Sequence, residues 1–248
     1  METTIMVQNL CKSYGNRPII KNINISVKKG EVFGLLGANG AGKSTTIECI
    51  LGTKIADKGT VSILGMNPIL DRKRLFENVG VQFQESNYQD KVTVSELCEV
   101  TQSLYKSATD YVKLIEQFGL ADQFNSFVSE LSGGQRQKLF IVLALIPDPK
   151  VVFLDELTTG LDTRARREVW NWLIFLKEQG LTIFLTSHFM DEVEALCDRI
   201  AILKKGQIVF EGTVAQAIQS SPYTDFEDVY LWYVEEHENE NLYNHVKK

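Results

Sequence analysis

The sequence predicts an α/β fold with a mixed sheet, an N-terminal antiparallel β portion and an inserted all-helical subdomain. Three observations lead to this prediction. The nearly all-apolar runs 32–36 and 151–154 have the composition of strands buried in a parallel sheet. A glycine-rich segment follows the first run directly and leads into a helical pattern. Between 92 and 146 the apolar residues recur at helical spacing, without a convincing strand.

The first third of the chain consists of strand patterns separated by turns. Strands are predicted over 5–14 and 19–27, which GNRP separates, and KKGE leads from the second to the apolar run 32–36. The other predicted strands are short runs, mostly of β-branched or aromatic residues: 61–64, 79–83, 151–154, 181–186, 200–203 and 208–210. Together they predict a sheet domain made from segments before and after the helical insert.

The helical insert has recognisable limits. Leu97, Val100 and Leu104 illustrate its helical spacing. Pro147 and Pro149 end it, because proline stops a helix and favours an extended approach to the next strand. We therefore expect an α/β core at 1–86 and 150–212, a helical subdomain at 87–149, and a C-terminal extension at 213–248 with a short helix and a polar tail.

Composition limits the classes of function. The 248 residues are 44% hydrophobic and 23% charged, as in soluble globular proteins. A formal charge of −6 argues against a broad nucleic-acid-binding surface, so no nucleic-acid partner is expected. The scattered cysteines form no CxxC pair, which argues against zinc or a disulfide framework. No apolar run approaches the roughly 20 residues that cross a bilayer, and the start lacks a signal-peptide pattern, so a membrane role is expected to need a partner.

The glycine-rich segment between strand and helix matches the phosphate-binding loop G-x-x-x-x-G-K-[ST]. Its residues are Gly37, Ala38, Asn39, Gly40, Ala41, Gly42, Lys43 and Ser44, followed by Thr45. Glycines let backbone N–H groups surround a phosphate, and the following helix directs its positive N-terminus to the same place. Lys43 adds a charge at the β- and γ-phosphates, and Ser44 offers a hydroxyl to Mg²⁺. The alternative, a glycine-rich turn with a surface lysine, does not account for the flanking strand and helix.

Two adjacent carboxylates end the strand 151–154. Asp155 suits Mg²⁺ binding, directly or through water, and Glu156 suits polarisation of an attacking water. Adjacent side chains diverge at a strand end, so one carboxylate can face the metal while the other faces the water. By itself such a pair caps a helix more often than it forms an active site, and both interpretations stay open at this point.

The segment Leu131 to Gln135 reads LSGGQ, the signature motif of the ABC ATPase family, and the chain resembles that family. Ser132 also has the residue type of an N-cap for the helix that follows. The two interpretations agree, because a capped helix N-terminus with bare glycine backbone is also an anion site. The resemblance implies that Ser132, Gly133, Gly134 and Gln135 bind the γ-phosphate held by an opposite subunit. It also implies a P-loop NTPase core with a RecA-like mixed sheet, and ATP and Mg²⁺ as cofactors.

The resemblance adds weaker assignments, in the expected order along the chain. It implies that Tyr14 stacks on adenine, and that Gln84 approaches Mg²⁺ and links the sheet to the helical insert. It implies that His188 senses the γ-phosphate and the attacking water, and that Leu161 and Asp162 lie in a loop that crosses to the partner subunit. Each has a plainer alternative: packing at a strand end for Tyr14, a solvated strand end for Gln84, a helix cap for Asp162, and a loop or capping role for His188.

The resemblance covers residues 10 to 212 and departs in two details. Leu157 and Thr163 stand where the family commonly has proline, which puts the rigidity of that loop in doubt. Beyond this region, the segment 226–230, FEDVY, is similar to a short segment that closes many ATPases of the ABC-2 exporter group. Its alternative is an amphipathic helix that packs its aromatic residues on the core.

The resemblance implies an ATP-hydrolysing subunit that dimerises on ATP, and two functions fit such a subunit. The first is an exporter-type transporter, in which a separate integral membrane permease docks in the groove near Gln84 and holds the chain at the cytoplasmic face of the cell membrane. The second is a soluble ABC ATPase of the iron–sulfur cluster assembly type, whose members are single units of similar length. The complete set of motifs permits a homodimer, and a heterodimer stays open.

Overall fold

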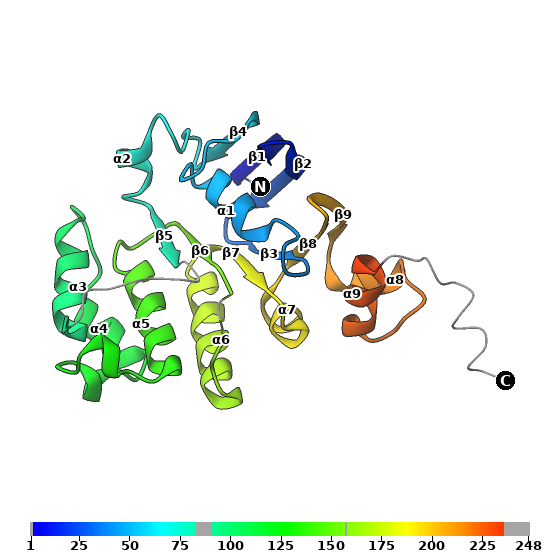
Figure 1. Cartoon of the computed structure of the whole chain (residues 1–248). Coiled ribbons are helices and arrows are strands. Elements are labelled where there is room, and N and C mark those ends of the chain that lie inside the picture. Colours follow the sequence, from blue (N-terminus) through cyan, green and yellow to red (C-terminus); the bar gives the residue numbers. More distant parts are fainter. Residues whose placement is uncertain (1, 83–90, 157, 236–248) are drawn as a thin grey trace.

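Two sheets form the framework of the computed structural model, which describes residues 2–82, 91–156 and 158–235 (Figure 1). The smaller sheet is antiparallel, with the order β2 (Arg17–Lys28), β1 (Thr3–Tyr14) and β4 (Lys58–Ile63). The larger has the order β5 (Val79–Gln82), β6 (Val151–Leu154), β7 (Thr182–Ser187), β3 (Val32–Leu36), β8 (Arg199–Lys204) and β9 (Gln207–Gly212). The β8–β9 pair is antiparallel and the other pairs are parallel.

The central strands of the larger sheet place the functional segments. Every residue of β3, β6 and β7 is buried, as expected for parallel strands covered on both faces. Strands β3 and β6 have the bounds that their apolar runs predict. Because parallel strands end at the same edge of a sheet, the segments that begin at Gly37, Asp155 and His188 meet there.

The described chain between 91 and 146 is helical, as the apolar spacing predicts. It contains α3 (Val94–Ser103), α4 (Tyr111–Gln117) and α5 (Gly133–Leu145), with short 3-10 turns at Ala121–Gln123 and Val128–Glu130. These helices lie together beside β5 and β6 in Figure 1. They share one hydrophobic cluster with Val152 and Leu154 of β6 and with Ile183 of β7. The limits of a separate subdomain at 87 and 149 therefore stay a prediction.

A second hydrophobic cluster lies between the two sheets around α1 (Lys43–Ile50). Ile47 and Ile50 pack there with residues of both sheets, among them Ile5 and Phe153. The short helix α2 (Arg72–Leu75) adds its buried Leu75 to the same cluster. The sequence does not predict α2, because three of its four residues are basic and no apolar period develops over one turn.

The described chain after β6 contains the helices α6 (Thr163–Glu178), α7 (Met190–Leu196), α8 (Val214–Gln219) and α9 (Phe226–Val234). Val169 and Leu173 of α6 pack in the cluster of the helical insert, whereas α9 packs on β8. Phe226 and Val229 of α9 are 1% and 0% exposed and pack with Ile200 and Ile202. The interpretation of 226–230 as a helix that packs on the core is therefore confirmed. Across the described ranges no helix combines the length and the apolar character needed to cross a membrane.

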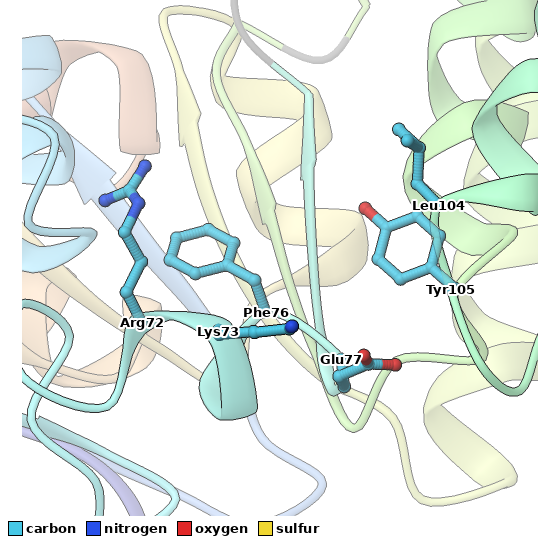
Figure 2. A pocket seen from close by; sticks show the side chains of 6 residues that line it. All are labelled: Arg72, Lys73, Phe76, Glu77, Leu104 and Tyr105. Atoms are coloured by element: carbon cyan, nitrogen blue, oxygen red, sulfur yellow. The ribbon is translucent and has the colours of Figure 1, made fainter.

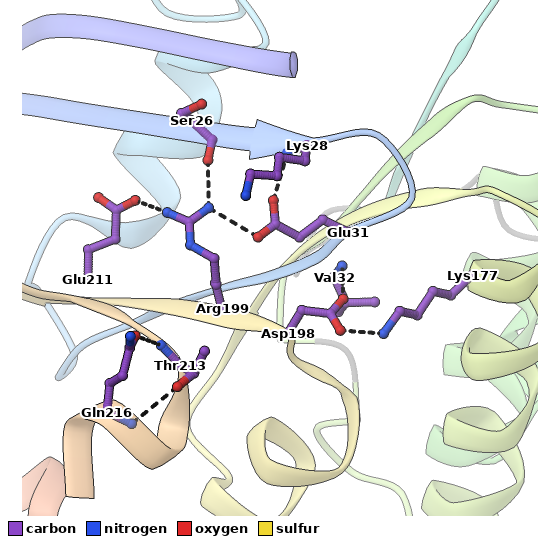
Figure 3. A network of polar contacts seen from close by, with 10 residues as sticks. All are labelled: Ser26, Lys28, Glu31, Val32, Lys177, Asp198, Arg199, Glu211, Thr213 and Gln216. Carbon is purple, nitrogen blue, oxygen red and sulfur yellow. Dashed lines mark hydrogen bonds and ion pairs between the residues drawn. The ribbon is translucent and has the colours of Figure 1, made fainter. Parts of the chain in front are cut away.

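A polar network fastens the smaller sheet to the larger one (Figure 3). Arg199 of β8 donates to the carbonyl oxygen of Ser26 and to Glu31, both at 3.0 Å, and pairs with Glu211 of β9. Glu31 is 7% exposed and also accepts from the Lys28 backbone N–H at 2.6 Å. A buried carboxylate is costly unless it is paired and hydrogen-bonded, so these contacts favour one placement of β2 over β3 and β8.

Candidate functional site

The loop after β3 folds tightly around its own backbone, and glycine makes this possible. Gly40 and Gly42 have φ values of 78° and 110°, which L side chains disfavour. A Cβ atom on Gly37 would lie 2.6 Å from the carbonyl oxygen of Leu203, so the loop lies directly against β8. Gly42 is the N-cap of α1, and the unpaired N–H groups of the first turn of α1 therefore face the space beside the loop.

Lys43 is held inside this loop. It is 6% exposed, and its Nζ donates to the carbonyl oxygen of Gly37 at 2.7 Å and to that of Ala38 at 3.4 Å. Burial lowers the pKa of Lys43, while the carboxylates of Glu156 and Asp155 act in the opposite direction. A buried cation at the N-terminus of a helix is a favourable place for a phosphate group.

The loop borders a cavity of about 710 Å³, a size within the roughly 300–1,000 Å³ of ligand pockets. The predicted site residues in its lining are Tyr14, Gly37, Asn39, Gly40, Gly42, Lys43, Ser44, Thr45, Glu156 and His188. Ala38, Arg17, Ile19 and Tyr230 also line it. Ala41 and Asp155 are buried and are not part of the lining. Gln84 lies outside the described residues.

The two adjacent carboxylates after β6 diverge, as the sequence predicts. Glu156 lines the cavity, whereas Asp155 is 4% exposed and accepts a hydrogen bond from the Thr186 hydroxyl at 2.5 Å. The same hydroxyl accepts from the backbone N–H of Glu156 at 2.9 Å. Glu156 has a φ of 52°, an uncommon value for a residue with a side chain. Thr186 therefore fixes a strained turn that directs Glu156 into the cavity.

The LSGGQ segment begins α5 and is not part of the cavity lining. Ser132 and Gln135 form a capping box: the Ser132 hydroxyl accepts from Gln135 N–H at 3.2 Å, and the Gln135 side chain accepts from Ser132 N–H at 2.9 Å. The predicted N-cap is confirmed. A Cβ on Gly134 would lie 3.3 Å from Leu161, so the signature lies beside the loop before α6. Its separation from the cavity means that one chain does not bring all the predicted phosphate-binding groups together.

Comparison with known proteins decides the family. The ABC transporter family profile matches residues 20–159. The chain belongs to the ABC transporter family. It is 43% identical over 207 residues to the "Nod factor export ATP-binding protein I" of Mesorhizobium japonicum, a match that spans 81% of this chain and 61% of that protein.

Solved structures confirm the predicted fold class of this ABC cassette. The structure of an ATP-binding subunit of an ABC transporter has a TM-score of 0.85 at 25% identity, and the match covers 93% of this chain and 99% of that one. A dimeric ATP-binding cassette in a post-hydrolysis state, bound to ADP and Pi, has a TM-score of 0.77 at 25% identity, with 84% and 98% covered. The mixed sheet and the antiparallel β portion are thus those of an ABC cassette.

Of three further predicted residues, His188 and Tyr14 line the cavity and Asp162 does not. His188 directly follows β7, is exposed to solvent, and has its ring centroid 4.2 Å from that of Phe189. Tyr14 is 47% exposed at the end of β1. Asp162 accepts hydrogen bonds from Arg164 N–H and Ala165 N–H, both at 2.9 Å, so its interpretation as the N-cap of α6 is confirmed.

Three residues that shape the cassette's site were missed by the sequence analysis. The sequence places Thr186 only at the end of a strand, and Tyr230 only in the segment 226–230, without a role at the site. Gly206, in the β8–β9 turn, donates its N–H to the Ala41 carbonyl at 3.0 Å and accepts from Lys21 N–H at 2.8 Å. It thereby holds the phosphate loop against β2. The threonine two residues before the predicted sensor His188 is the one signal in the sequence that points to such a role.

Proposed function

We propose that this chain binds and hydrolyses ATP as the cassette of an exporter-type ABC transporter. The observation that carries this proposal is the single cavity that contains both Lys43 and Glu156. This supports the proposal, because a buried cation that suits phosphate and a carboxylate that suits water line one space. The cavity also has room for the base and the ribose, with Tyr14 at its rim.

Within this cavity each chain residue has a distinct task. Lys43 and the N–H groups of the loop bind the β- and γ-phosphates. Glu156 accepts a proton from the attacking water, a general-base contribution of about 10²–10⁴ in rate. His188, exposed after β7, orients that water and contacts the γ-phosphate. Tyr14 stacks on adenine.

The donors near the loop fit Mg²⁺. Ser44 lines the cavity with a hydroxyl, and Asp155 offers a carboxylate from the buried side of the same edge, which are the hard oxygen ligands that Mg²⁺ prefers. Among the described residues no group of three or more His, Cys, Asp or Glu could hold a metal ion. This pattern suits an ion bound mainly by phosphate oxygens and water. When bound, Mg²⁺ supplies neutralisation of phosphate charge.

A second copy of the chain supplies the missing half of each site. The capped N-terminus of α5, with two bare glycines, lies outside the cavity, so it is available to the γ-phosphate of an opposite subunit. The solved dimeric cassette with ADP and Pi supports this arrangement. Because the chain carries both halves, two identical chains form two complete sites.

A membrane partner docks in a groove that is separate from the nucleotide cavity. A second cavity, of about 500 Å³, lies between α2 and the end of α3 and is lined by Arg72, Lys73, Phe76, Glu77, Leu104 and Tyr105 (Figure 2). Leu104 is 71% exposed, and the Arg72 guanidinium lies 4.9 Å from the centroid of Phe76. Apolar and charged side chains together suit a short amphipathic segment. The partner thereby holds the cassette at the cytoplasmic face of the membrane.

Export is supported by the relative from Mesorhizobium japonicum, which is a Nod factor export ATP-binding protein. This observation favours transport over the iron–sulfur assembly alternative. The test is a pull-down of tagged Glu156→Gln chain from its native cell in mild detergent with Mg-ATP. We expect a polytopic membrane protein in stoichiometric amount. The control is Lys43→Ala in the same background, and recovery of a soluble assembly partner instead would contradict the transporter proposal.

A further inference from the structure

A completely buried carboxyl group lies behind the site and is not part of its cavity. Glu192, on α7, is 0% exposed. Its Oε1 accepts a hydrogen bond from the Thr158 hydroxyl at 2.7 Å and one from the indole N–H of Trp170 at 3.1 Å. Glu192 is absent from the cavity lining, so it does not touch a ligand there.

The partners of Glu192 belong to the segments that carry the chemistry. Thr158 is 1% exposed and lies two residues after Glu156. Glu192 itself lies four residues after His188 and two after the start of α7. Trp170 adds α6, the helix that follows the loop containing Leu161. The carboxyl group of Glu192 thus links three segments. They are the segment that follows Glu156, the helix α7 that follows His188, and the helix α6.

A second set of contacts joins the residues around His188 to the helices α6 and α7. Arg166 of α6 lies 3.1 Å from the Asp191 carboxylate and has its guanidinium 4.1 Å from the ring centroid of Phe189. The Ser187 hydroxyl, directly before His188, also favours the charged form of Glu192, whereas burial dominates and raises the pKa of the Glu192 carboxyl. The residues on either side of His188 are therefore held to α6 and α7.

Stability alone does not explain a carboxyl group at this place. Replacing buried charged groups with apolar residues of similar volume is often neutral or stabilising, so such groups are weak evidence for a stability role. Their better-supported use is to select one arrangement among several. In this fold the hydrogen bond between Thr158 and Glu192 joins the segment after β6 to α7, which follows β7.

We infer that Glu192 is a positioning residue that couples the segment carrying Glu156 to the segment carrying His188, so that both groups reach the γ-phosphate side of the cavity in register. This inference rests on the proposed ATP hydrolysis and adds a residue that acts on turnover and not on ATP binding. ATP affinity depends on the phosphate loop, which Glu192 does not contact. Turnover depends on Glu156 and His188, which lie on the two segments that Glu192 joins.

The test separates turnover from binding in variants of the full chain. Thr158→Val removes one hydroxyl with little change of shape, and Glu192→Ala removes the carboxyl group. We expect each to lower kcat by about 10- to 100-fold, the size of effect that a displacement of about 1 Å has on catalysis. The Kd for ATP should stay that of the unmodified chain, since the loop is untouched. Thermal unfolding, followed in parallel, gives the folded fraction.

Two further variants make the test specific. Glu192→Gln keeps an oxygen that accepts from Thr158 and Trp170, so we expect it to retain most of the turnover that Glu192→Ala loses. Glu194→Gln changes an exposed carboxylate on the same helix, and we expect no change in kcat.

Unchanged kcat in Thr158→Val, or a rise in Kd that matches the loss of kcat, would overturn the inference while leaving the proposed ATPase intact. A Glu192→Gln variant as inactive as Glu192→Ala would also overturn it. An unmodified chain that binds ATP but never hydrolyses it would contradict the proposed function, and the inference with it.

Discussion

The hydroxyl of Thr186 accepts a hydrogen bond from the backbone N–H of Glu156 at 2.9 Å and donates one to the Asp155 carboxylate. One side chain on β7 therefore sets the turn that ends β6. The positive φ of Glu156 costs conformational energy, and the surrounding contacts must supply it. This relationship explains how adjacent carboxylates diverge, with Glu156 in the cavity and Asp155 buried behind it.

Thr186→Val should therefore lower kcat by more than its loss of folding stability explains. Both hydrogen bonds are lost, so we expect the free energy of unfolding to fall by about 1–3 kcal/mol and kcat to fall by about tenfold or more. Thr182→Val is the matched control, because Thr182 is buried on the same strand and its hydroxyl accepts from Gly30 N–H at 3.0 Å, far from the catalytic edge. The control should lose comparable stability and keep its kcat. Equal kcat losses in the two variants would remove the special role of Thr186.

Lys43→Ala should lose ATP affinity. A hydrogen bond to a charged group contributes about 1.5–3 kcal/mol, which corresponds to about 10- to 100-fold in Kd. Titration with a fluorescent ATP analogue measures this change directly. Lys58→Ala, an exposed lysine on β4, should bind as the unmodified chain does. Normal ATP turnover by Lys43→Ala would exclude the phosphate-loop assignment.

Glu156→Gln should separate ATP binding from hydrolysis. Loss of the general base lowers kcat by about 10²–10⁴-fold, while the loop and Lys43 still bind ATP. The γ-phosphate then stays between the cavity of one chain and the α5 N-terminus of another. We expect a dimer in size-exclusion chromatography with Mg-ATP and a monomer with ADP. A double variant that adds Lys43→Ala should stay monomeric, and an ATP-loaded Glu156→Gln monomer at every salt concentration would argue against the two-chain site.

Tyr230 should contribute to nucleotide binding from the C-terminal helix. Phe226 and Val229 anchor α9 on β8, and this placement turns the half-buried Tyr230 toward the cavity. An aromatic contact contributes about 0.5–1.5 kcal/mol, so Tyr230→Ala should raise the Kd for ATP by about two- to tenfold. Tyr230→Phe keeps the ring and should bind almost normally. Leu231→Ala, on the exposed side of α9, is the control, and an unchanged Kd for Tyr230→Ala would show that Tyr230 borders the cavity without touching ATP.

Features that depend on neighbouring residues in the sequence could be predicted, whereas features that depend on tertiary packing could not. The bounds of β3 and β6 follow from apolar runs, and the caps by Ser132 and Asp162 follow from residue type and a short spacing. The groups that assemble around these elements depend on tertiary packing. Thr186 reaches Glu156 only because β6 and β7 are neighbours in the sheet, and Tyr230 reaches the cavity only because α9 packs on β8. Neither neighbour relation is encoded near the residue itself.

The last prediction compares substitutions at Gly206 and Gly180, because this comparison separates the cost of backbone strain from the cost of a steric clash. Gly206 and Gly180 have φ values of 81° and 95°, so a side chain is strained at either position. A Cβ on Gly206 would also lie 2.0 Å from the carbonyl oxygen of Ile19, whereas a Cβ on Gly180 would meet nothing within 4 Å. A substitution therefore causes backbone strain at both glycines, but it causes a steric clash only at Gly206.

Gly180→Ala should lower the free energy of unfolding by about 1–2 kcal/mol, the usual cost of an L residue in this backbone region, and should leave ATP binding unchanged. Gly206→Ala should lower it further, because the β8–β9 turn must move away from Ile19 and the bond from Gly206 N–H to the Ala41 carbonyl is lost. The phosphate loop then loses its support, so the Kd for ATP should rise as well. Denaturant unfolding and ATP titration measure the two effects separately, and a Gly206→Ala chain that binds ATP as tightly as Gly180→Ala would show that the loop keeps its shape without the turn.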